Sequence, residues 1–121
     1  MRIMKVLLIN GSPRREGNTY IALNEVAKKL NEYGIEADIE WIGNKAVQGC
    51  IACYSCKKTG NCTFRDDLMT RIEKKVEECD ALIVGSPVYF AGPNGSLCAF
   101  LDRLFCSHGI HLRYKPAASV A

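Results

Sequence analysis

Short apolar runs alternate with amphipathic segments along this chain, and this alternation is the feature that most constrains its fold. The first run, IMKVLLI from Ile3 to Ile9, is almost continuously apolar, which is typical of a strand buried on both faces of a parallel sheet. Residues Thr19 to Tyr33 then repeat apolar side chains at helical spacing, and Gly34 supplies a stop signal. Ile35 to Ile42 is predicted to be the second strand.

The same alternation continues through the second half of the chain. A helix capped by Asp66 or Asp67 is predicted to precede a third strand at Ala81 to Ser86. A third amphipathic helix follows over Leu97 to Phe105, and the final residues AASVA open a fourth strand. Strands that alternate with helices need right-handed crossovers, which predicts an α/β fold with helices on both faces of a parallel sheet. We expect the doubly wound, flavodoxin-like strand order 2-1-3-4.

Composition narrows the functional classes. The 121 residues predict one domain, and the 48% apolar and 24% charged residues are ordinary for a globular chain. The net charge of +3 is scattered among acidic residues, so a nucleic-acid surface is not indicated. No apolar run reaches the ~18 residues of a membrane span, and we expect a cytoplasmic protein. Seven cysteines in such a protein favour metal binding or catalysis over a disulfide framework.

The loop NGSPRREGNT, which follows the first strand, is predicted to bind an anion. It leads from a strand into a helix N-terminus, where unpaired N–H groups and the helix dipole attract negative charge. Gly17-Asn18-Thr19 stands where a Walker loop needs Gly-Lys-Ser/Thr, which disfavours a nucleoside triphosphate. The alternative is a capped helix after a glycine turn. The candidate phosphate-binding residues are Gly11, Ser12, Arg14, Gly17, Asn18 and Thr19.

A second loop, SPVYFAGPNG, follows the third strand and places apolar and aromatic residues beside the first. Pro87, Val88, Tyr89 and Phe90 suit the face of a flat ring at the switch point of the sheet. A phosphate site next to a planar-ring site favours flavin mononucleotide (FMN). The alternative for Tyr89 or Phe90 is that the ring closes the hydrophobic core.

A cysteine-rich insertion at about residues 43–66 carries the pattern C-x2-C-x2-C-x5-C. Its members are Cys50, Cys53, Cys56 and Cys62. The first three thiolates can converge on one cluster face, and the fourth can return within the same loop, which favours an iron-sulfur cluster. A zinc site, free thiols, or disulfides formed after cluster loss are the alternatives. The three other cysteines, Cys79, Cys98 and Cys106, are expected to pack as small apolar residues.

Three blocks together, LLINGSPRREGNT, GCIACYSCKKTGNCTFRDD and ALIVGSPVYFAGPNGSLCAFLDR, resemble the flavodoxin-like NAD(P)H-dependent FMN reductase family, and within it the iron-sulfur flavoprotein branch. The resemblance implies that Ser12, Arg14, Asn18 and Thr19 hold the FMN phosphate and that residues 87–90 flank the isoalloxazine. It also implies a [4Fe-4S] cluster, a homo-oligomer (dimer or tetramer) in which one subunit's cysteine loop approaches another's flavin, and ferredoxin or NAD(P)H as donor.

The chain departs from this family pattern in two ways. The family's domain continues to a fifth strand in the order 2-1-3-4-5, so we expect the domain at 1–121 to be C-terminally incomplete, truncated after the start of strand four. Cys98 stands where many relatives carry lysine, so a role attached to that lysine does not transfer.

Several polar residues receive a structural interpretation. His108 and His111 follow a helix end without a carboxylate or cysteine at compatible spacing, and we expect surface histidines. Asp102 and Arg103 are interpreted as a surface ion pair or as a contact with another subunit.

These observations together predict a flavin-dependent oxidoreductase that passes electrons between a reduced donor, FMN and a [4Fe-4S] cluster. A cluster-free NAD(P)H-dependent FMN or quinone reductase is the first alternative. A non-catalytic shuttle like flavodoxin is the second, although flavodoxins usually have strongly acidic surfaces and this chain does not. A truncated chain that binds neither cofactor is the third.

Overall fold

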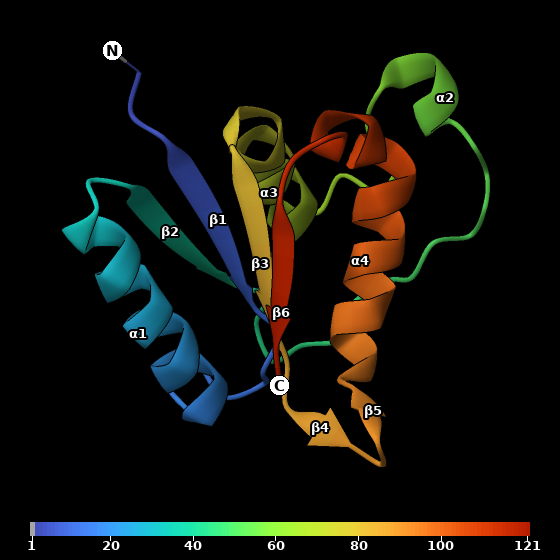
Figure 1. Ribbon diagram of the computed structural model, residues 1–121. Coiled ribbons are helices and arrows are strands. Elements are labelled where there is room, and N and C mark those ends of the chain that lie inside the picture. The colour runs from blue at the N-terminus through green and yellow to red at the C-terminus, as the bar shows by residue number, and fades with distance from the viewer. Residues whose placement is uncertain (1) are drawn as a thin grey trace.

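The structure, a computed structural model that describes residues 2–121, contains a four-stranded parallel sheet with helices on both faces (Figure 1). The sheet has the order β2-β1-β3-β6, and each neighbouring pair runs parallel. The predicted order 2-1-3-4 is therefore confirmed. The strands of the sheet are β1 (Lys5–Asn10), β2 (Glu36–Trp41), β3 (Ala81–Gly85) and β6 (Ala117–Val120).

The long helices divide between the two faces of the sheet (Figure 1). Helix α1 (Asn18–Glu32) covers one face, and α3 (Asp67–Glu78) and α4 (Gly95–His108) cover the other. Shorter elements complete the fold: α2 (Cys56–Thr59) in the cysteine loop, the hairpin of β4 (Val88–Tyr89) and β5 (Gly92–Pro93), and the 3-10 helix η1 (Gly109–Leu112). None of the helices between residues 2 and 121 has the length and apolar character needed to cross a bilayer.

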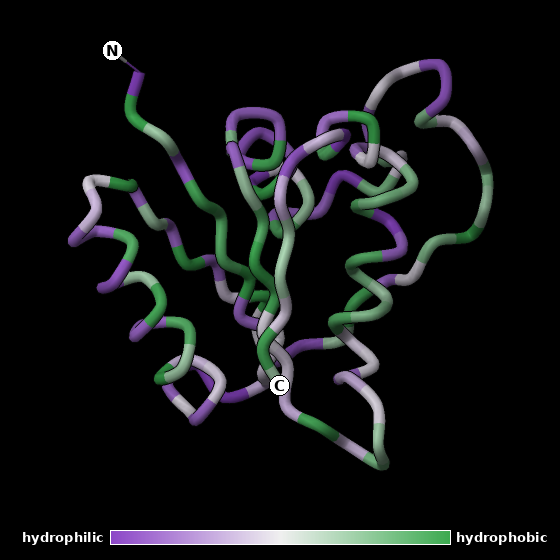
Figure 2. The backbone as a smooth tube through the Cα atoms, viewed as in Figure 1, coloured by the Kyte–Doolittle hydropathy of each residue, from purple (hydrophilic) through white to green (hydrophobic). Residues whose placement is uncertain are grey.

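Strand β1 shows why the sheet is buried on both sides. Successive side chains of a strand point to opposite faces. Val6 and Leu8 accordingly pack towards α1, whereas Leu7 and Ile9 pack towards α3 and α4. Figure 2 shows apolar residues concentrated in the central strands, while polar residues recur along the outer turns of α1 and α3.

Helix α3 begins at a side-chain cap, as the sequence predicts. The Asp66 carboxylate accepts a hydrogen bond from Met69 N at 2.9 Å, which satisfies one of the unpaired N–H groups of the first turn. Asn94 caps α4 in the same way, through a bond of 3.3 Å from Ser96 N. Helix α1 differs, because its N-cap residue Gly17 has no side chain and no other side chain caps its first turn.

Two polar residues that the sequence assigns to the surface lie in the interior. His108 is 0% exposed and Arg103 is 1% exposed. Both predictions were wrong, because residues distant in sequence supply polar partners that make burial possible: Glu77 for His108 and Asp66 for Arg103. Cys79 is buried in the core as expected, but Cys98 and Cys106 are only half-buried.

Candidate functional site

The loop between β1 and α1 lies at the carboxyl end of the sheet and is held by three hydrogen bonds of Asn10 and Trp41. The side chain of Asn10, which is 0% exposed, donates to Arg15 O at 3.0 Å and accepts from Ser12 N at 3.1 Å. Trp41, at the end of β2, donates from Nε1 to Ser12 O at 2.7 Å. Asn10 and Trp41 therefore hold the loop in one shape, and the sequence analysis assigned neither of them to the site.

Helix α1 begins directly after this loop with a free N-terminus. Its first turn has no side-chain cap and no acidic residue, so the unpaired N–H groups and the positive end of the helix dipole remain available. Arg14 is exposed beside it, and the Ser12 hydroxyl accepts from Arg14 N at 3.1 Å, which leaves its own proton free to donate. Asn18 is exposed and Thr19 half-buried in the first turn. These donors fit a phosphate group.

The first candidate flavin loop packs closely against β3 and α4 at Gly11. A Cβ atom on Gly11 would lie 2.5 Å from a methyl carbon of Leu97 and 2.8 Å from Gly85 O, so no larger residue fits there. Asn94 joins the loops, because its side chain donates to Gly11 O at 2.7 Å and its N–H donates to Ser86 Oγ at 2.9 Å. Sequence reasoning missed Asn94, although an asparagine directly before a helical pattern is a signal for an N-cap.

The second loop presents its apolar side chains to solvent. Val88 is 58% exposed, Tyr89 is 48% exposed and Phe90 is fully exposed. The alternative that Tyr89 or Phe90 closes the core is therefore wrong. Phe90 and Ala91 form the two-residue turn between β4 and β5 with φ angles of +48° and +62°. Apolar side chains held out on a hairpin at the same end of the sheet as an uncapped helix N-terminus fit the face of a planar ring.

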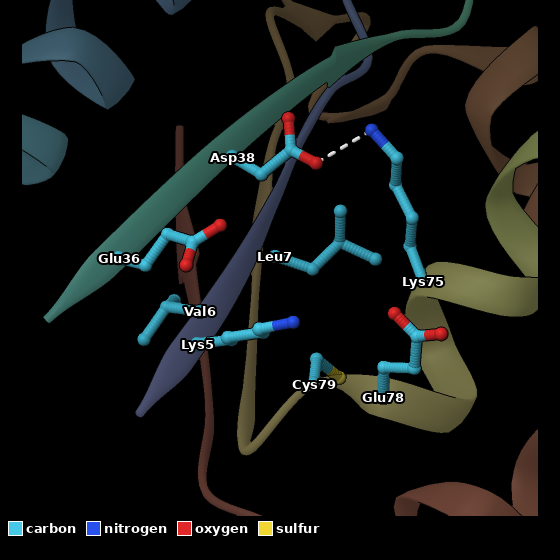
Figure 3. A pocket seen from close by; sticks show the side chains of 8 residues that line it. All are labelled: Lys5, Val6, Leu7, Glu36, Asp38, Lys75, Glu78 and Cys79. Carbon is cyan, nitrogen blue, oxygen red and sulfur yellow. Dashed lines mark hydrogen bonds and ion pairs between the residues drawn. The ribbon is translucent and has the colours of Figure 1, made fainter. Parts of the chain in front are cut away.

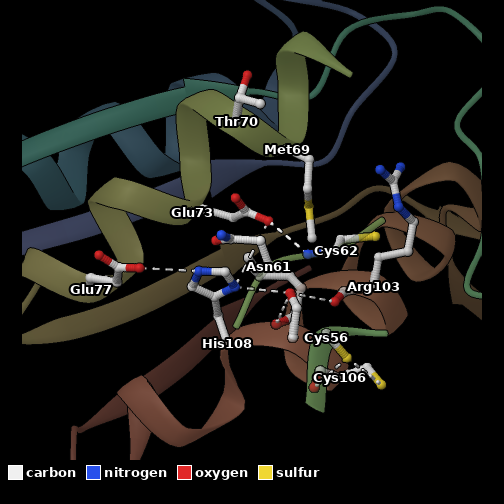
Figure 4. Close-up of polar contacts among 12 residues, drawn as sticks. Cys56, Asn61, Cys62, Met69, Thr70, Glu73, Glu77, Arg103, Cys106 and His108 are labelled. Atoms are coloured by element: carbon white, nitrogen blue, oxygen red, sulfur yellow. Dashed lines mark hydrogen bonds and ion pairs between the residues drawn. The ribbon is translucent and has the colours of Figure 1, made fainter. Parts of the chain in front are cut away.

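The four loop cysteines line one pocket together with a fifth thiol. Cys106, on α4, contributes this thiol, and its Sγ lies 3.8 Å from Cys56 Sγ (Figure 4). The expectation that Cys106 packs only as a small apolar residue was therefore wrong. The Cys56 thiol and burial both raise the pKa of Cys106. The pocket is lined by Cys50, Cys53, Cys56, Cys62 and Cys106, with Ile51, Tyr54, Thr63, Phe64, Arg103 and Ser107.

The loop backbone turns sharply between these cysteines. Ala52 and Tyr54 have φ angles of +56° and +58°, and Ala52 N donates to Cys50 Sγ at 3.4 Å. The N–H and hydroxyl groups of Ser55 lower the pKa of Cys53, which favours its thiolate. Hydrogen bonds to sulfur from a tightly turned loop suit thiolates that ligate a metal group.

The spacing of the loop thiols is wider than a single ion requires. Thiolates bound 2.3 Å from one zinc ion lie about 3.8 Å apart. Within residues 2–121, the three-ligand groups whose donor atoms all lie within 4.8 Å of one another do not include these cysteines. The four loop thiols therefore do not form a compact site for one ion in this structure.

Arg103 brings a buried positive charge to the wall of the cysteine pocket (Figure 4). Its guanidinium pairs with Asp66 at 2.9 Å and donates to the carbonyl oxygens of Gln48 and Phe64 at 3.1 and 3.0 Å. Burial opposes the charge, but Asp66 and Cys62 raise the pKa of Arg103. Its Nε is buried and makes no hydrogen bond within the described chain. An unpaired donor beside Cys62 fits an anionic group bound in this pocket.

A further cavity, of about 120 Å³, lies at the opposite end of β1 from the flavin loops (Figure 3). Lys75 reaches over it from α3 to Asp38 and, at 2.6 Å, to Glu40. Burial opposes the charge of Lys75, but these carboxylates raise its pKa. The ion pairs of Lys75 connect α3 to β2, and we interpret them as structural.

The cysteine pocket and the flavin loops lie at opposite ends of α4. The helix begins beside the hairpin at the carboxyl end of the sheet and ends beside α2 (Figure 1). Asn94 and Cys106 are separated by twelve residues of this helix, which corresponds to about 18 Å at a rise of 1.5 Å per residue. The two candidate sites are thus distinct within one chain.

The sequence matches the family described as NADPH-dependent FMN reductase over residues 4–121. An iron-sulfur flavoprotein of Methanocaldococcus jannaschii is 41% identical over 98% of this chain and 61% of its own length. A protein of the same name from Archaeoglobus fulgidus is 38% identical over 97% of the chain and 53% of its own length. The chain therefore spans between half and two thirds of the length of these relatives.

Solved structures show the same fold at low sequence identity. RosB, solved with a bound 8-demethyl-8-formylriboflavin-5'-phosphate intermediate, aligns over 96% of this chain and 50% of its own with a TM-score of 0.71 and 21% identity. A flavoenzyme NAD(P)H:(acceptor) oxidoreductase from Paracoccus denitrificans aligns over 97% of this chain and 59% of its own with a TM-score of 0.69 and 15% identity. These similarities confirm the predicted fold class.

Proposed function

Because this chain belongs to the NADPH-dependent FMN reductase family and to its iron-sulfur flavoprotein branch, we propose that it acts in a flavin-dependent oxidoreductase that also carries a [4Fe-4S] cluster. The observation that carries the proposal is that one chain combines an uncapped helix N-terminus at the carboxyl end of the sheet with a pocket lined by clustered thiols. The electron donor in this proposal is NAD(P)H or ferredoxin.

Residues of the flavin loops would bind and orient FMN. The first-turn N–H groups of α1, with Ser12, Arg14, Asn18 and Thr19, would hold its phosphate, and Gly11 and Gly17 allow the backbone to approach. Residues 87–90 would flank the ring and exclude water from one of its faces. When bound, FMN exchanges electrons in pairs or singly, which suits it to link a two-electron donor to a one-electron carrier.

Residues of the cysteine loop would hold the cluster. Cys50, Cys53, Cys56 and Cys62 supply the four thiolates, and Arg103 and Ala52 N–H place positive charge or hydrogen-bond donors beside them. The ~18 Å between the sites favours a homo-oligomer in which the cysteine loop of one subunit lies near the flavin of another.

A cluster-free NAD(P)H-dependent FMN or quinone reductase is the second candidate. The contact between the Cys56 and Cys106 sulfurs supports it, because a thiol that makes a hydrogen bond to another thiol, here at 3.8 Å, keeps its proton and does not bind iron. Both candidates share the same flavin site.

Asn18→Asp tests the flavin site through two effects of opposite sign. A carboxylate in the first turn of α1 is expected to stabilise the flavin-free chain by about 0.3–1 kcal/mol through the helix dipole. The same charge would repel the FMN phosphate and weaken FMN binding at least tenfold, measured by fluorescence titration. Asn31→Asp, near the other end of α1, is the control and should leave FMN affinity unchanged. Equal FMN affinity in wild type and Asn18→Asp would place the flavin phosphate elsewhere.

A further inference from the structure

Three potential metal ligands meet where α3, the end of α4 and η1 come together, and Figure 4 shows two of them, Glu77 and His108. Glu77 comes from α3, His108 is the last residue of α4, and His111 lies in η1. The Glu77 carboxylate lies 3.2 Å from His108 Nε2 and 4.0 Å from His111 Nε2. Ligand atoms of all three residues lie within 4.8 Å of one another.

We propose that Glu77, His108 and His111 form a binding site for a divalent transition-metal ion of the Zn²⁺ type. Two imidazoles and one carboxylate are ligands that such ions accept, at distances of about 2.0–2.2 Å that separate neighbouring ligand atoms by about 3.3 Å. The pair of Glu77 and His108 already has this separation. His111 is 41% exposed, so its ring is free to close the remaining gap.

The surroundings of His108 orient Nε2 towards the proposed ion. Its Nδ1 lies 2.9 Å from Ser107 Oγ and 3.9 Å from the buried Glu73 carboxylate. The single hydroxyl proton of Ser107 has Arg103 O as an acceptor at 2.9 Å. With that proton so placed, Ser107 accepts a hydrogen bond from Nδ1–H, which is the outer contact that metal-binding histidines usually make.

This tautomer leaves an electrostatic mismatch that either a metal cation or a second proton on the imidazole resolves. With the proton on Nδ1, the Nε2 lone pair of the fully buried His108 faces the carboxylate of Glu77, and two acceptors then confront each other. Lys115 does not fill this role, since its ammonium donates to the carbonyl oxygens of Val76 and Glu77. The ionisable side chains that lie within 4.0 Å of the Glu77 carboxylate are the two histidines.

The competing arrangement needs no metal. If the Ser107 hydroxyl donated a hydrogen bond to Nδ1, or if both ring nitrogens carried a proton, then Nε2–H would donate to Glu77 and the cluster would be an ordinary buried hydrogen-bond chain. The two arrangements differ in one measurable property, which is the affinity of this cluster for a divalent ion. None of the three ligands belongs to the candidate flavin or cysteine ligands, so the proposal does not depend on the proposed function.

Titration of the full chain with Co²⁺ under anaerobic conditions tests the proposal. Cobalt is the probe because thiolate ligation gives intense charge-transfer absorption that imidazole and carboxylate ligation lacks, so binding to the cysteine loop is recognised separately. We expect His111→Ala and Glu77→Gln each to weaken one Co²⁺ site at least about 100-fold while the thiolate absorption stays unchanged. Both residues are partly exposed, and circular dichroism checks that the variants fold.

Glu78→Gln is the matched control, because Glu78 is the exposed neighbour of Glu77 on the same helix. It should bind as many Co²⁺ ions as wild type. The thermal unfolding midpoint should also rise with Zn²⁺ more in wild type and Glu78→Gln than in His111→Ala. Equal cobalt stoichiometry and equal zinc response in wild type, Glu77→Gln and His111→Ala would overturn the proposal and leave the hydrogen-bond chain.

Discussion

At the residue scale, buried polar side chains connect the cysteine loop to the helices around it. Arg103 joins α4 to the residue before α3 through Asp66 and to the cysteine loop through two carbonyl oxygens. Glu73 acts from α3, where its carboxylate accepts from Cys62 N at 3.2 Å and pairs with Arg65. The insertion is therefore attached to the fold by polar contacts to a few long-range partners, together with the packing of Val47 and Cys62 against the core.

Asp80 makes a comparable contact at the start of β3 and carries a prediction about pH. Its carboxylate accepts from Lys5 N at 2.8 Å and pairs with Arg2, and these contacts lower its pKa. A carboxylate whose pKa is lowered on folding stabilises the native state above its unfolded pKa of about 3.9, and this contribution is lost as pH falls through the folded pKa. Asp80→Asn is expected to reduce the free energy of unfolding near neutral pH and less so in acid.

Urea unfolding of wild type and Asp80→Asn between neutral pH and about pH 3 measures this difference. Glu25→Gln, which removes an exposed carboxylate on α1, is the control for the loss of one negative charge. A stability difference between wild type and Asp80→Asn that stays constant over this range would contradict the assignment.

The same residues show what sequence alone can and cannot predict. The parallel sheet followed from local patterns, such as the apolar run that became β1, because burial on both faces leaves a local signature. The burial of Arg103 and His108 did not follow, since their partners lie 37 and 31 residues away. The apolar helical pattern around Cys106 likewise predicts only core packing for this residue. Its contact with Cys56 depends on where α2 lies in the fold, which the local pattern does not contain.

At the scale of elements, the β4–β5 hairpin combines exposure with backbone strain. Its two turn residues, Phe90 and Ala91, have positive φ angles that favour glycine or asparagine. Ala91→Gly is expected to raise the free energy of unfolding by about 1 kcal/mol, because the left-handed conformation costs alanine about 1–2 kcal/mol. Chemical denaturation measures the change.

Ala99→Gly, in the middle of α4, is the matched control with the opposite sign. Glycine in a helix interior is less favourable than alanine by about 1 kcal/mol, so this variant should be less stable than wild type. If Ala91→Gly were destabilising as well, the hairpin would not adopt the turn described for it.

At the scale of the whole molecule, the separation of the two candidate sites along α4 carries a prediction about assembly. If flavin and cluster meet across subunits, Cys53→Ala chains that bind FMN should complement Asn18→Asp chains that keep the cluster. A mixture allowed to exchange subunits is expected to reduce the cluster when donor is added, whereas each variant alone does not. Absorption at the cluster band follows this reaction, and a mixture no faster than the separate variants would show transfer within one chain.

The central claim is that one chain holds both FMN and a [4Fe-4S] cluster, and cofactor analysis of protein purified without oxygen tests it most directly. Iron, acid-labile sulfide and released flavin are quantified on one sample, beside Cys53→Ala as control. The account predicts about four irons, about four sulfides and about one FMN per chain, with iron lost and flavin kept in Cys53→Ala. Flavin without iron and sulfide in the wild-type protein would contradict it and leave the cluster-free reductase.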